Sequence, residues 1–197
     1  MFGILFLSGY LFYVYGRWGS LILTIGVFTM VTGPGGALFS VDLKRTLACS
    51  SVSQIGFILV GVGLLGLLGG ENALAVRGSL LHMVNHSLIK LVLFMAAGVV
   101  FMNVHKLDLN DIRGFGRKKP LLHFIFLMGA FGIGGVPLFN GYISKTLIHE
   151  SIVEYLELIK TGAASGIFGV SAMKGIEWAF LISGGLTVAY MTKLYVA

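Results

Sequence analysis

The sequence predicts an all-α membrane protein, a polytopic bundle of transmembrane helices in which one helix is broken. Of its 197 residues, 56% are hydrophobic and only 11% are charged, whereas a soluble domain is usually about 25% charged. The apolar residues form runs long enough to cross a bilayer, which takes about 20 residues. One run is interrupted by glycines and a proline, residues that break membrane helices.

Composition also excludes several function classes. The single cysteine, Cys49, excludes a disulfide framework and a zinc or iron–sulfur site held by cysteines of this chain. The formal net charge of +6 is spread over loops, which disfavours nucleic acid as a partner. No basic region or cleavage site precedes Arg17, so a normal signal peptide is not indicated. We expect neither a cofactor nor a metal ion in this chain.

We expect a single transmembrane domain over residues 1–197 with five to six spans. The apolar segments are Met1–Gly16, Leu21–Val41, Thr46–Gly70, Ala73–Val104, Leu121–Ser144 and Trp178–Ala197. The first is short for a full span. The fifth is the broken one, because Gly134, Gly135 and Pro137 lie in its middle.

The segment Leu147–Lys160 has an acidic face and an apolar face at helical spacing. The acidic face consists of Glu150, Glu154 and Glu157, and the apolar face of Ile148, Ile152, Tyr155 and Ile159. This pattern predicts an amphipathic helix in the membrane interface or against a partner subunit. A flexible loop is expected over residues 161–171, which are rich in Gly, Ala and Ser.

Basic residues predict the orientation. If the spans alternate, one side of the membrane carries Lys44, Arg45, Lys106, Arg113, Arg117, Lys118 and Lys119, and the other carries Arg17, Lys160 and Lys174. Positive loops face the cytoplasm or its equivalent. We therefore expect the 42–45 and 105–119 loops there.

Three ionisable residues lie on one face of the 73–104 segment. His82, His86 and Lys90 follow at i, i+4 and i+8, which puts them within about 80° of one another with steps of roughly 6 Å. An ionisable side chain near the bilayer centre costs on the order of 3 kcal/mol or more, so this stripe indicates function. Groups at that spacing can be bridged by water, which is typical of a proton relay. The alternative is a polar face that packs against neighbouring helices.

Metal and haem sites are poorer interpretations of the histidines. His82 and His86 have the spacing of a helical zinc site, but Met83 stands where the zincin glutamate would be and no third ligand is evident. Two histidines on one helix face cannot occupy opposite faces of a haem.

Lys145 lies just after the predicted break. Discontinuous helices mark ion pathways in transporters, so Lys145 is a candidate for a charged group inside the bilayer. The alternative interpretation is that the Lys145 side chain extends so that its ammonium reaches the membrane interface.

Four stretches between residues 42 and 145 carry a family resemblance: DLKRTLACSSVSQIGF (42–57), LLHMVNHSLIKLVLFMAAG (80–98), DIRGFGRKKPL (111–121) and GVPLFNGYISK (135–145). The sequence resembles the antiporter-like subunits of respiratory complex I, and their relatives in membrane-bound hydrogenases, formate hydrogenlyases and multisubunit cation/proton antiporters.

The resemblance implies roles for single residues. His82, His86 and Lys90 match the middle of a hydrated proton path. Lys145 matches the exit-side lysine of the broken helix, and Lys44 and Arg45 match a structural basic pair. The implied partners are other membrane subunits, the lipid bilayer, and protons or Na⁺.

The implied function is proton translocation as a membrane subunit of a redox-driven pump, such as NADH:quinone oxidoreductase or an energy-converting hydrogenase. The chain has no redox motif, so electrons would travel in partner subunits. The alternatives are a subunit of a secondary cation/proton antiporter and an inert, truncated scaffold. The membrane would be a bacterial cell membrane or an inner mitochondrial membrane.

The sequence departs from the family in extent. The matching region is the second of two inverted five-helix repeats, and the first repeat is absent, so we expect a fragment or one piece of a split subunit. Met1–Gly16 resembles the end of the first repeat's last helix. Thr146 and Leu147 stand where some members carry acidic residues.

Overall fold

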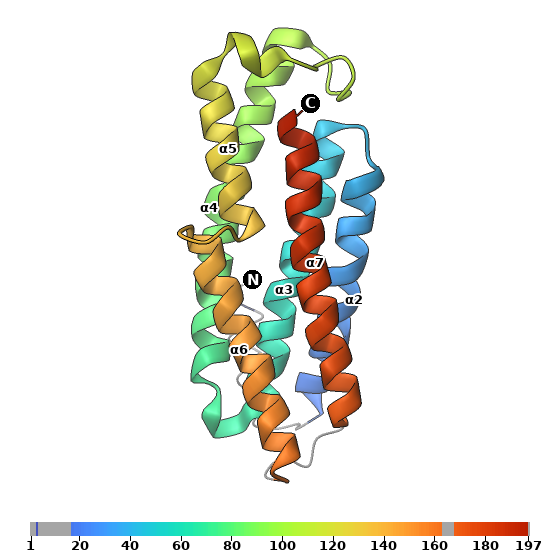
Figure 1. The fold of residues 1–197 in the computed structure, drawn as a ribbon, viewed down its shortest axis with the longest axis vertical. Coiled ribbons are helices and arrows are strands. Elements are labelled where there is room, and N and C mark those ends of the chain that lie inside the picture. Colours follow the sequence, from blue (N-terminus) through green and yellow to red (C-terminus); the bar gives the residue numbers. More distant parts are fainter. Residues whose placement is uncertain (1–2, 4–16, 163–167, 197) are drawn as a thin grey trace.

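The computed structural model describes residues 3, 17–162 and 168–196, and its long helices run along one common axis (Figure 1). The α-helices are α2 (Trp18–Phe39), α3 (Leu43–Leu68), α4 (Ala73–Val104), α5 (Pro120–Gly134), α6 (Asn140–Lys160) and α7 (Val170–Val196). Short 3₁₀ helices occupy Gly69–Glu71 and Phe115–Lys118. The expected segment Met1–Gly16 lies outside the described residues except for Gly3.

Helices α2, α3, α4 and α7 are each long and apolar enough to cross a membrane. Helices α5 and α6 are stacked end to end beside α4 and together run along much of the bundle (Figure 1). α5 is apolar but shorter than the four candidate spans. The predicted all-α membrane fold with one broken helix is confirmed. The 73–104 span is observed with the predicted bounds.

The 42–45 and 105–119 loops meet at one end of the bundle, the upper end in Figure 1. Leu43 N donates to Leu107 O at 2.9 Å, and Leu109 N donates to Val41 O at 2.8 Å. The opposite end holds the start of α2, the end of α6 and the start of α7. The two basic loops therefore share one side, as the orientation argument requires.

Helices α2 and α3 pack very closely because glycines face the partner backbone. A Cβ added at Gly26 would lie 2.7 Å from Val60 N, and one added at Gly63 would lie 2.6 Å from Leu23 N. Small residues of this kind let membrane helices approach each other. The end of α2 is held by α7, because Lys193 Nζ donates to Leu38 O at 2.7 Å.

The break follows from the residues predicted for it. α5 ends at Gly134, and Gly135 adopts a left-handed conformation with φ of 80°, which glycine adopts without strain. Gly141 passes so close to α5 that a Cβ there would clash with Gly132 O. The break at Gly134, Gly135 and Pro137 thus allows α6 to begin beside the end of α5.

The helix predicted over Leu147–Lys160 is observed, but its predicted position in the membrane interface is wrong. This segment is continuous with the first turns of α6, which runs from Asn140 to Lys160. Ile148, Ile152 and Tyr155 are buried in the main hydrophobic core. A helix with one apolar face can pack that face against a protein core or against a bilayer surface. Helical periodicity alone could therefore not distinguish these two placements.

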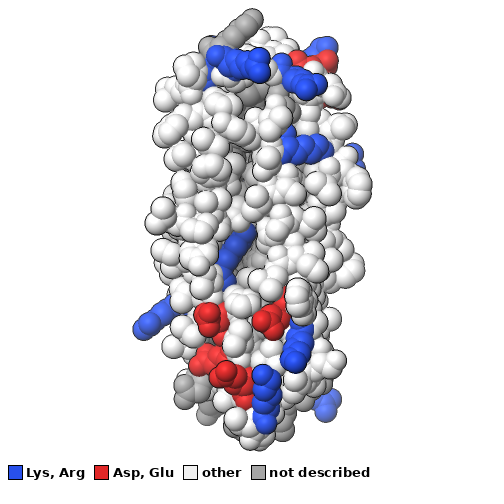
Figure 2. Space-filling view, in the orientation of Figure 1, with Lys and Arg blue, Asp and Glu red and all other residues white. Residues whose placement is uncertain are grey.

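The acidic face of α6 lies toward the end of the bundle. Figure 2 shows most of the acidic side chains on the viewed face near its lower end, where α6 runs. There His149 of α6 and Glu177 of α7 approach to 3.5 Å.

The last span begins earlier than predicted. α7 starts at Val170 and not at Trp178, and Met173 in the additional turns is fully buried. The first turns of α7 are polar and contain a glycine, so their intrinsic helix propensity is low. Packing against the core stabilises them as a helix. Of the expected 161–171 loop, residues 163–167 lie outside the described part of the chain.

The shared position of the two loops gives a topology prediction. In a Cys49→Ser background, Asn110→Cys should resist a membrane-impermeant thiol reagent added outside intact cells, because the seven basic residues at this end predict that it faces the cytoplasm. Lys160→Cys, at the exposed end of α6, is the matched control and should react. Fast labelling at position 110 with protection at position 160 would reverse the orientation.

Candidate functional site

Polar side chains are buried along the interior of the bundle. They come from α3, α4, α6 and α7 and include Ser50, Ser53, Gln54, Ser79, His82, Lys90, Ser144, Lys145, Ser183 and Thr187. Polar groups inside a membrane protein are costly unless hydrogen-bonded, so their partners define the site.

His82 joins three helices. It is 2% exposed, its Nδ1 lies 2.9 Å from Ser144 Oγ of α6, and its Nε2 lies 3.1 Å from Gln54 Oε1 of α3. Gln54 Nε2 in turn donates to Thr187 Oγ1 of α7 at 3.4 Å. Both ring nitrogens of His82 therefore have a polar partner.

The partners of His82 accommodate two protonation states. In the neutral ring, Ser144 donates to Nδ1 while Nε2–H donates to Gln54 Oε1. In the charged ring both nitrogens donate, and the Ser144 hydroxyl turns to the Gly141 carbonyl, which lies 3.2 Å away. A proton can thus be gained or lost without leaving a ring nitrogen unpaired.

Lys90 is held by α3. Its Nζ donates to Leu47 O at 2.7 Å and also to Ser50 Oγ, and the residue is 6% exposed. Its acceptors are an uncharged carbonyl and a hydroxyl.

Lys145 points into the bundle. It is 8% exposed, its Nζ donates to Ile133 O at 2.9 Å, and the same atom lies 4.9 Å from the centre of the Phe57 ring. The alternative in which its ammonium reaches the interface is therefore wrong. In a continuous helix the Ile133 carbonyl would accept from residue 137, but Pro137 has no N–H. The proline creates the acceptor that the lysine uses.

His86 is set apart from its two neighbours on the stripe. It is partly buried, and its Nε2 has no hydrogen-bond partner in the described part of the chain. The adjacent Asn85 instead ties α4 to the start of α6, since Asn85 Nδ2 donates to Asn140 O at 3.0 Å. The helical spacing of the stripe is correct, but Lys90 forms its hydrogen bonds with α3, and His82 forms its hydrogen bonds with α3 and α6.

The sequence interpretation missed the residues that partner the stripe. The direct partners are Ser50 and Gln54 of α3 and Ser144 of α6. Thr187 of α7 bonds to Gln54 in turn. The signal was the polar run Ser50-Ser51-Val52-Ser53-Gln54 inside an otherwise apolar span. Such a run in a membrane helix indicates a face turned toward protein.

The site is cationic. Among the side chains that the structure describes, neither Lys90 nor Lys145 has a carboxylate within 4.0 Å. The described residues contain no group of three His, Cys, Asp or Glu side chains placed to hold a metal ion. Lysine and histidine side chains of this kind are able to take up and release protons.

A comparison with known protein families agrees with the fold. The model of the family described as "NADH:quinone oxidoreductase/Mrp antiporter, TM" matches residues 1–169. The chain belongs to this family. The resemblance inferred from the sequence motifs is confirmed.

Relatives within this antiporter family belong to different kinds of complex. The chain is 32% identical over 185 residues to formate hydrogenlyase subunit 3 of Escherichia coli, covering 90% of this chain and 29% of that one. It is 32% identical over 174 residues to a Na⁺/H⁺ antiporter subunit of Bacillus subtilis, covering 85% and 22%. The chain thus spans less than a third of the length of these relatives.

A solved member of the family has the same fold. A structure of the Mrp complex from a Dietzia species superposes with a TM-score of 0.73 at 25% identity, covering 90% of this chain and 18% of that one. The chain is thus an integral membrane member of a family whose relatives are subunits of multisubunit complexes.

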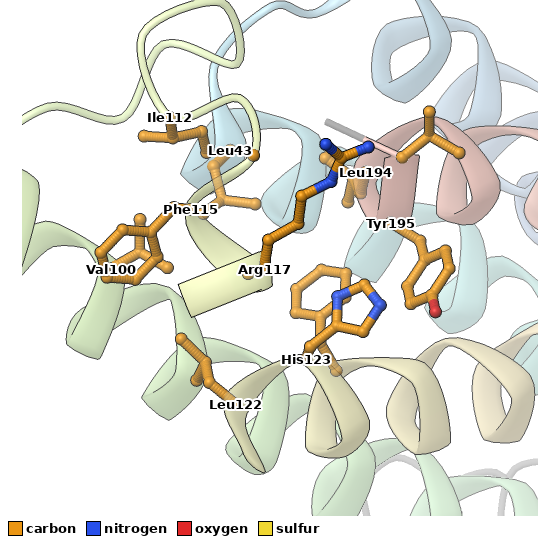
Figure 3. A pocket seen from close by; sticks show the side chains of 13 residues that line it. Leu43, Val100, Ile112, Phe115, Arg117, Leu122, His123, Leu194 and Tyr195 are labelled. Atoms are coloured by element: carbon orange, nitrogen blue, oxygen red, sulfur yellow. The ribbon is translucent and has the colours of Figure 1, made fainter. Parts of the chain in front are cut away.

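In this family member a pocket of about 290 Å³ lies away from the polar interior, at the end with the basic loops. Apolar side chains line it, including Leu43, Phe115 and Leu122, and Arg117 reaches across it (Figure 3). The rings of His123 and Tyr195 lie next to each other at one wall, with centres 4.4 Å apart and planes inclined by 32°. None of the predicted proton-path residues lines this pocket.

The contact between His82 and Ser144 yields a stability prediction. Ser144→Ala removes the partner of Nδ1 and should lower the unfolding free energy by about 1 kcal/mol, near the value of a single hydrogen bond. Thr146→Ala is the control, because its hydroxyl bonds only to Tyr142 O within its own helix. Thermal unfolding of the purified protein in detergent measures both. Equal stability of the two variants would contradict the contact.

Proposed function

We propose that the chain translocates protons across a membrane as part of a redox-driven, multisubunit pump related to NADH:quinone oxidoreductase or to energy-converting hydrogenases. The proton-path residues are His82, His86, Lys90 and Lys145. The observation that carries the proposal is that two lysines and a histidine are buried inside the bundle and that, among the described residues, their hydrogen-bond partners are uncharged oxygen atoms.

Uncharged acceptors favour a proton function. A lysine paired with a carboxylate loses an ion pair when it gives up its proton, which is costly in a buried site. An amine bonded to a carbonyl still donates an N–H after deprotonation, so less is lost. Lys90 on Leu47 O and Lys145 on Ile133 O are both of this kind.

The positive charges of Lys90 and Lys145 support protons over Na⁺ as the transported ion. A sodium ion needs several converging oxygen ligands, and a site lined by two ammonium groups repels it electrostatically. Protons can instead pass along ionisable side chains and bridging water, as in other membrane pumps.

Redox coupling is supported by the similarity to formate hydrogenlyase subunit 3. The chain would contribute the proton path, and electrons would move in partner subunits that contact the bundle. Protonation changes at the buried lysines must then respond to charge changes in those partners, which act over long distances in a low-dielectric interior.

A secondary cation/proton antiporter is the second candidate. It is supported by the similarity to the Na⁺/H⁺ antiporter of Bacillus subtilis and to the Mrp complex. The assembled complex in liposomes separates the two. Proton uptake on addition of a reductant, with no response to an imposed Na⁺ gradient, supports the redox pump, and the reverse supports the antiporter.

Lys145 provides the sharpest variant. In the assembled complex, Lys145→Ala should reduce proton translocation by roughly tenfold or more, because it removes an ionisable group from the path. Lys145→Glu keeps an ionisable group and should retain more translocation. Proton translocation and electron transfer are measured separately, and complex assembly is checked for each variant.

Lys174→Ala is the matched control, since this lysine is exposed at the end of the bundle, and it should behave as the unaltered protein. Full translocation by both Lys145→Ala and His82→Ala would contradict the proposed path.

A further inference from the structure

Two apolar pockets lie along α5 and α7 and meet at Tyr195, which lines both of them. The first, of about 290 Å³, lies at the end with the basic loops, where Arg117 reaches across it (Figure 3). The second, of about 170 Å³, is lined by α5 as far as Gly134 and by α7 from Val188 to Tyr195. Together the two pockets form one groove, the α5–α7 groove, which extends from the first turn of α5 to the break.

The length of the α5–α7 groove matches the depth of one lipid leaflet. Helix α5 has 15 residues, so at 1.5 Å per residue it is about 22 Å long. The hydrocarbon core of a bilayer is about 30 Å thick, and the acyl chains of one leaflet fill about half of it. A groove that begins at the basic end of the bundle and ends at the break therefore reaches from one membrane surface to near the bilayer centre.

The second pocket opens to the surface of the bundle. Phe131 and Val188, which line it, are 37% and 43% exposed, and Thr192 beside them is exposed as well. In a membrane such a surface contacts lipid. Water is a poor occupant, because a bound water molecule needs two to four polar partners and the side chains lining this pocket are apolar except those of Thr192 and Tyr195. A helix is about 10–12 Å across and too wide to enter so small a pocket, whereas a single acyl chain fits.

Positive charge is concentrated at one end of the groove. The 42–45 and 105–119 loops hold seven basic and three acidic residues. In the described part of the chain, Arg117 has no carboxylate within 4.0 Å. A guanidinium group matches the geometry of a phosphate and can donate two hydrogen bonds to it. The groove is thus apolar along its length and cationic where it reaches the membrane surface, which is the polarity of a binding site for an anionic amphiphile.

We propose that the α5–α7 groove binds one anionic phospholipid from the leaflet at the basic end, with the lipid phosphate on Arg117 and one acyl chain between α5 and α7. Basic pockets between membrane helices on the side of the positive loops bind anionic headgroups in this way. The bound lipid contacts both helices and stabilises their packing beside the break. Binding at this groove is independent of the proposed proton function.

The test is lipid retention by the full-length protein in native mass spectrometry. The protein is released from nanodiscs with equal amounts of anionic phosphatidylglycerol and zwitterionic phosphatidylcholine, both with the same acyl chains. One phosphatidylglycerol should be retained roughly tenfold more strongly than phosphatidylcholine, the factor expected for one charge-assisted hydrogen bond. Phosphatidylglycerol added to the protein in detergent should also raise the unfolding temperature by about 3 °C, and phosphatidylcholine should not.

Two pairs of variants locate the lipid. Arg117→Ala should abolish the preference for phosphatidylglycerol, whereas Arg113→Ala should keep it, because Arg113 is exposed in the same loop but lines neither pocket. Thr192→Trp fills the second pocket and should reduce retention of the lipid. Ile182→Trp is the matched control on α7, since Ile182 is 60% exposed and lines neither pocket, and it should leave retention unchanged.

Equal retention of the two lipids by the unaltered protein would overturn the proposal. So would an equal loss in Arg117→Ala and Arg113→Ala, which would reflect only the general charge of the loops. If Arg117→Ala does not fold, Thr192→Trp decides, and unchanged retention by this variant overturns the proposed groove. The same measurement on the assembled complex covers the remaining occupant: loss of the lipid on assembly would mean that a partner subunit fills the groove, and would also overturn the proposal.

Discussion

The bond between Lys145 Nζ and the Ile133 carbonyl joins the two unusual features of this bundle, a broken helix and a buried lysine. Pro137 has no N–H, so it leaves the Ile133 carbonyl free inside the membrane, where an unpaired carbonyl is costly. The Lys145 ammonium is costly there as well, and each group satisfies the other. The break allows the lysine to be buried, and the lysine stabilises the break.

Helix α3 plays the corresponding role for the stripe of α4. Its polar run supplies the Leu47 carbonyl and the Ser50 hydroxyl to Lys90, and the Gln54 amide to His82. All these partners are uncharged, so hydrogen bonds persist when a proton is gained or lost. A carboxylate partner would instead hold the lysines charged. The interior therefore permits changes of protonation state at a modest cost in stability.

Sequence reasoning predicted the parts that depend on local chemistry. The 73–104 span, the break at Gly134, Gly135 and Pro137, and the stripe on α4 follow from hydropathy, helix breakers and helical spacing. The lower half of α6 was misplaced, because its apolar face could pack on protein or on lipid with the same pattern. The partners of His82 and Lys90 depend on how α3 and α7 are rotated toward α4. A single sequence does not reveal these relative rotations.

The central claim is that buried, uncharged contacts let His82 change protonation state while the complex works. Infrared difference spectroscopy of the assembled complex, with ¹⁵N-labelled histidine, tests it most directly. On addition of reductant, bands of a protonating imidazole should appear, shift with the label, and be lost in His82→Gln. Reductant-driven proton translocation without any His82-dependent imidazole band would contradict the account.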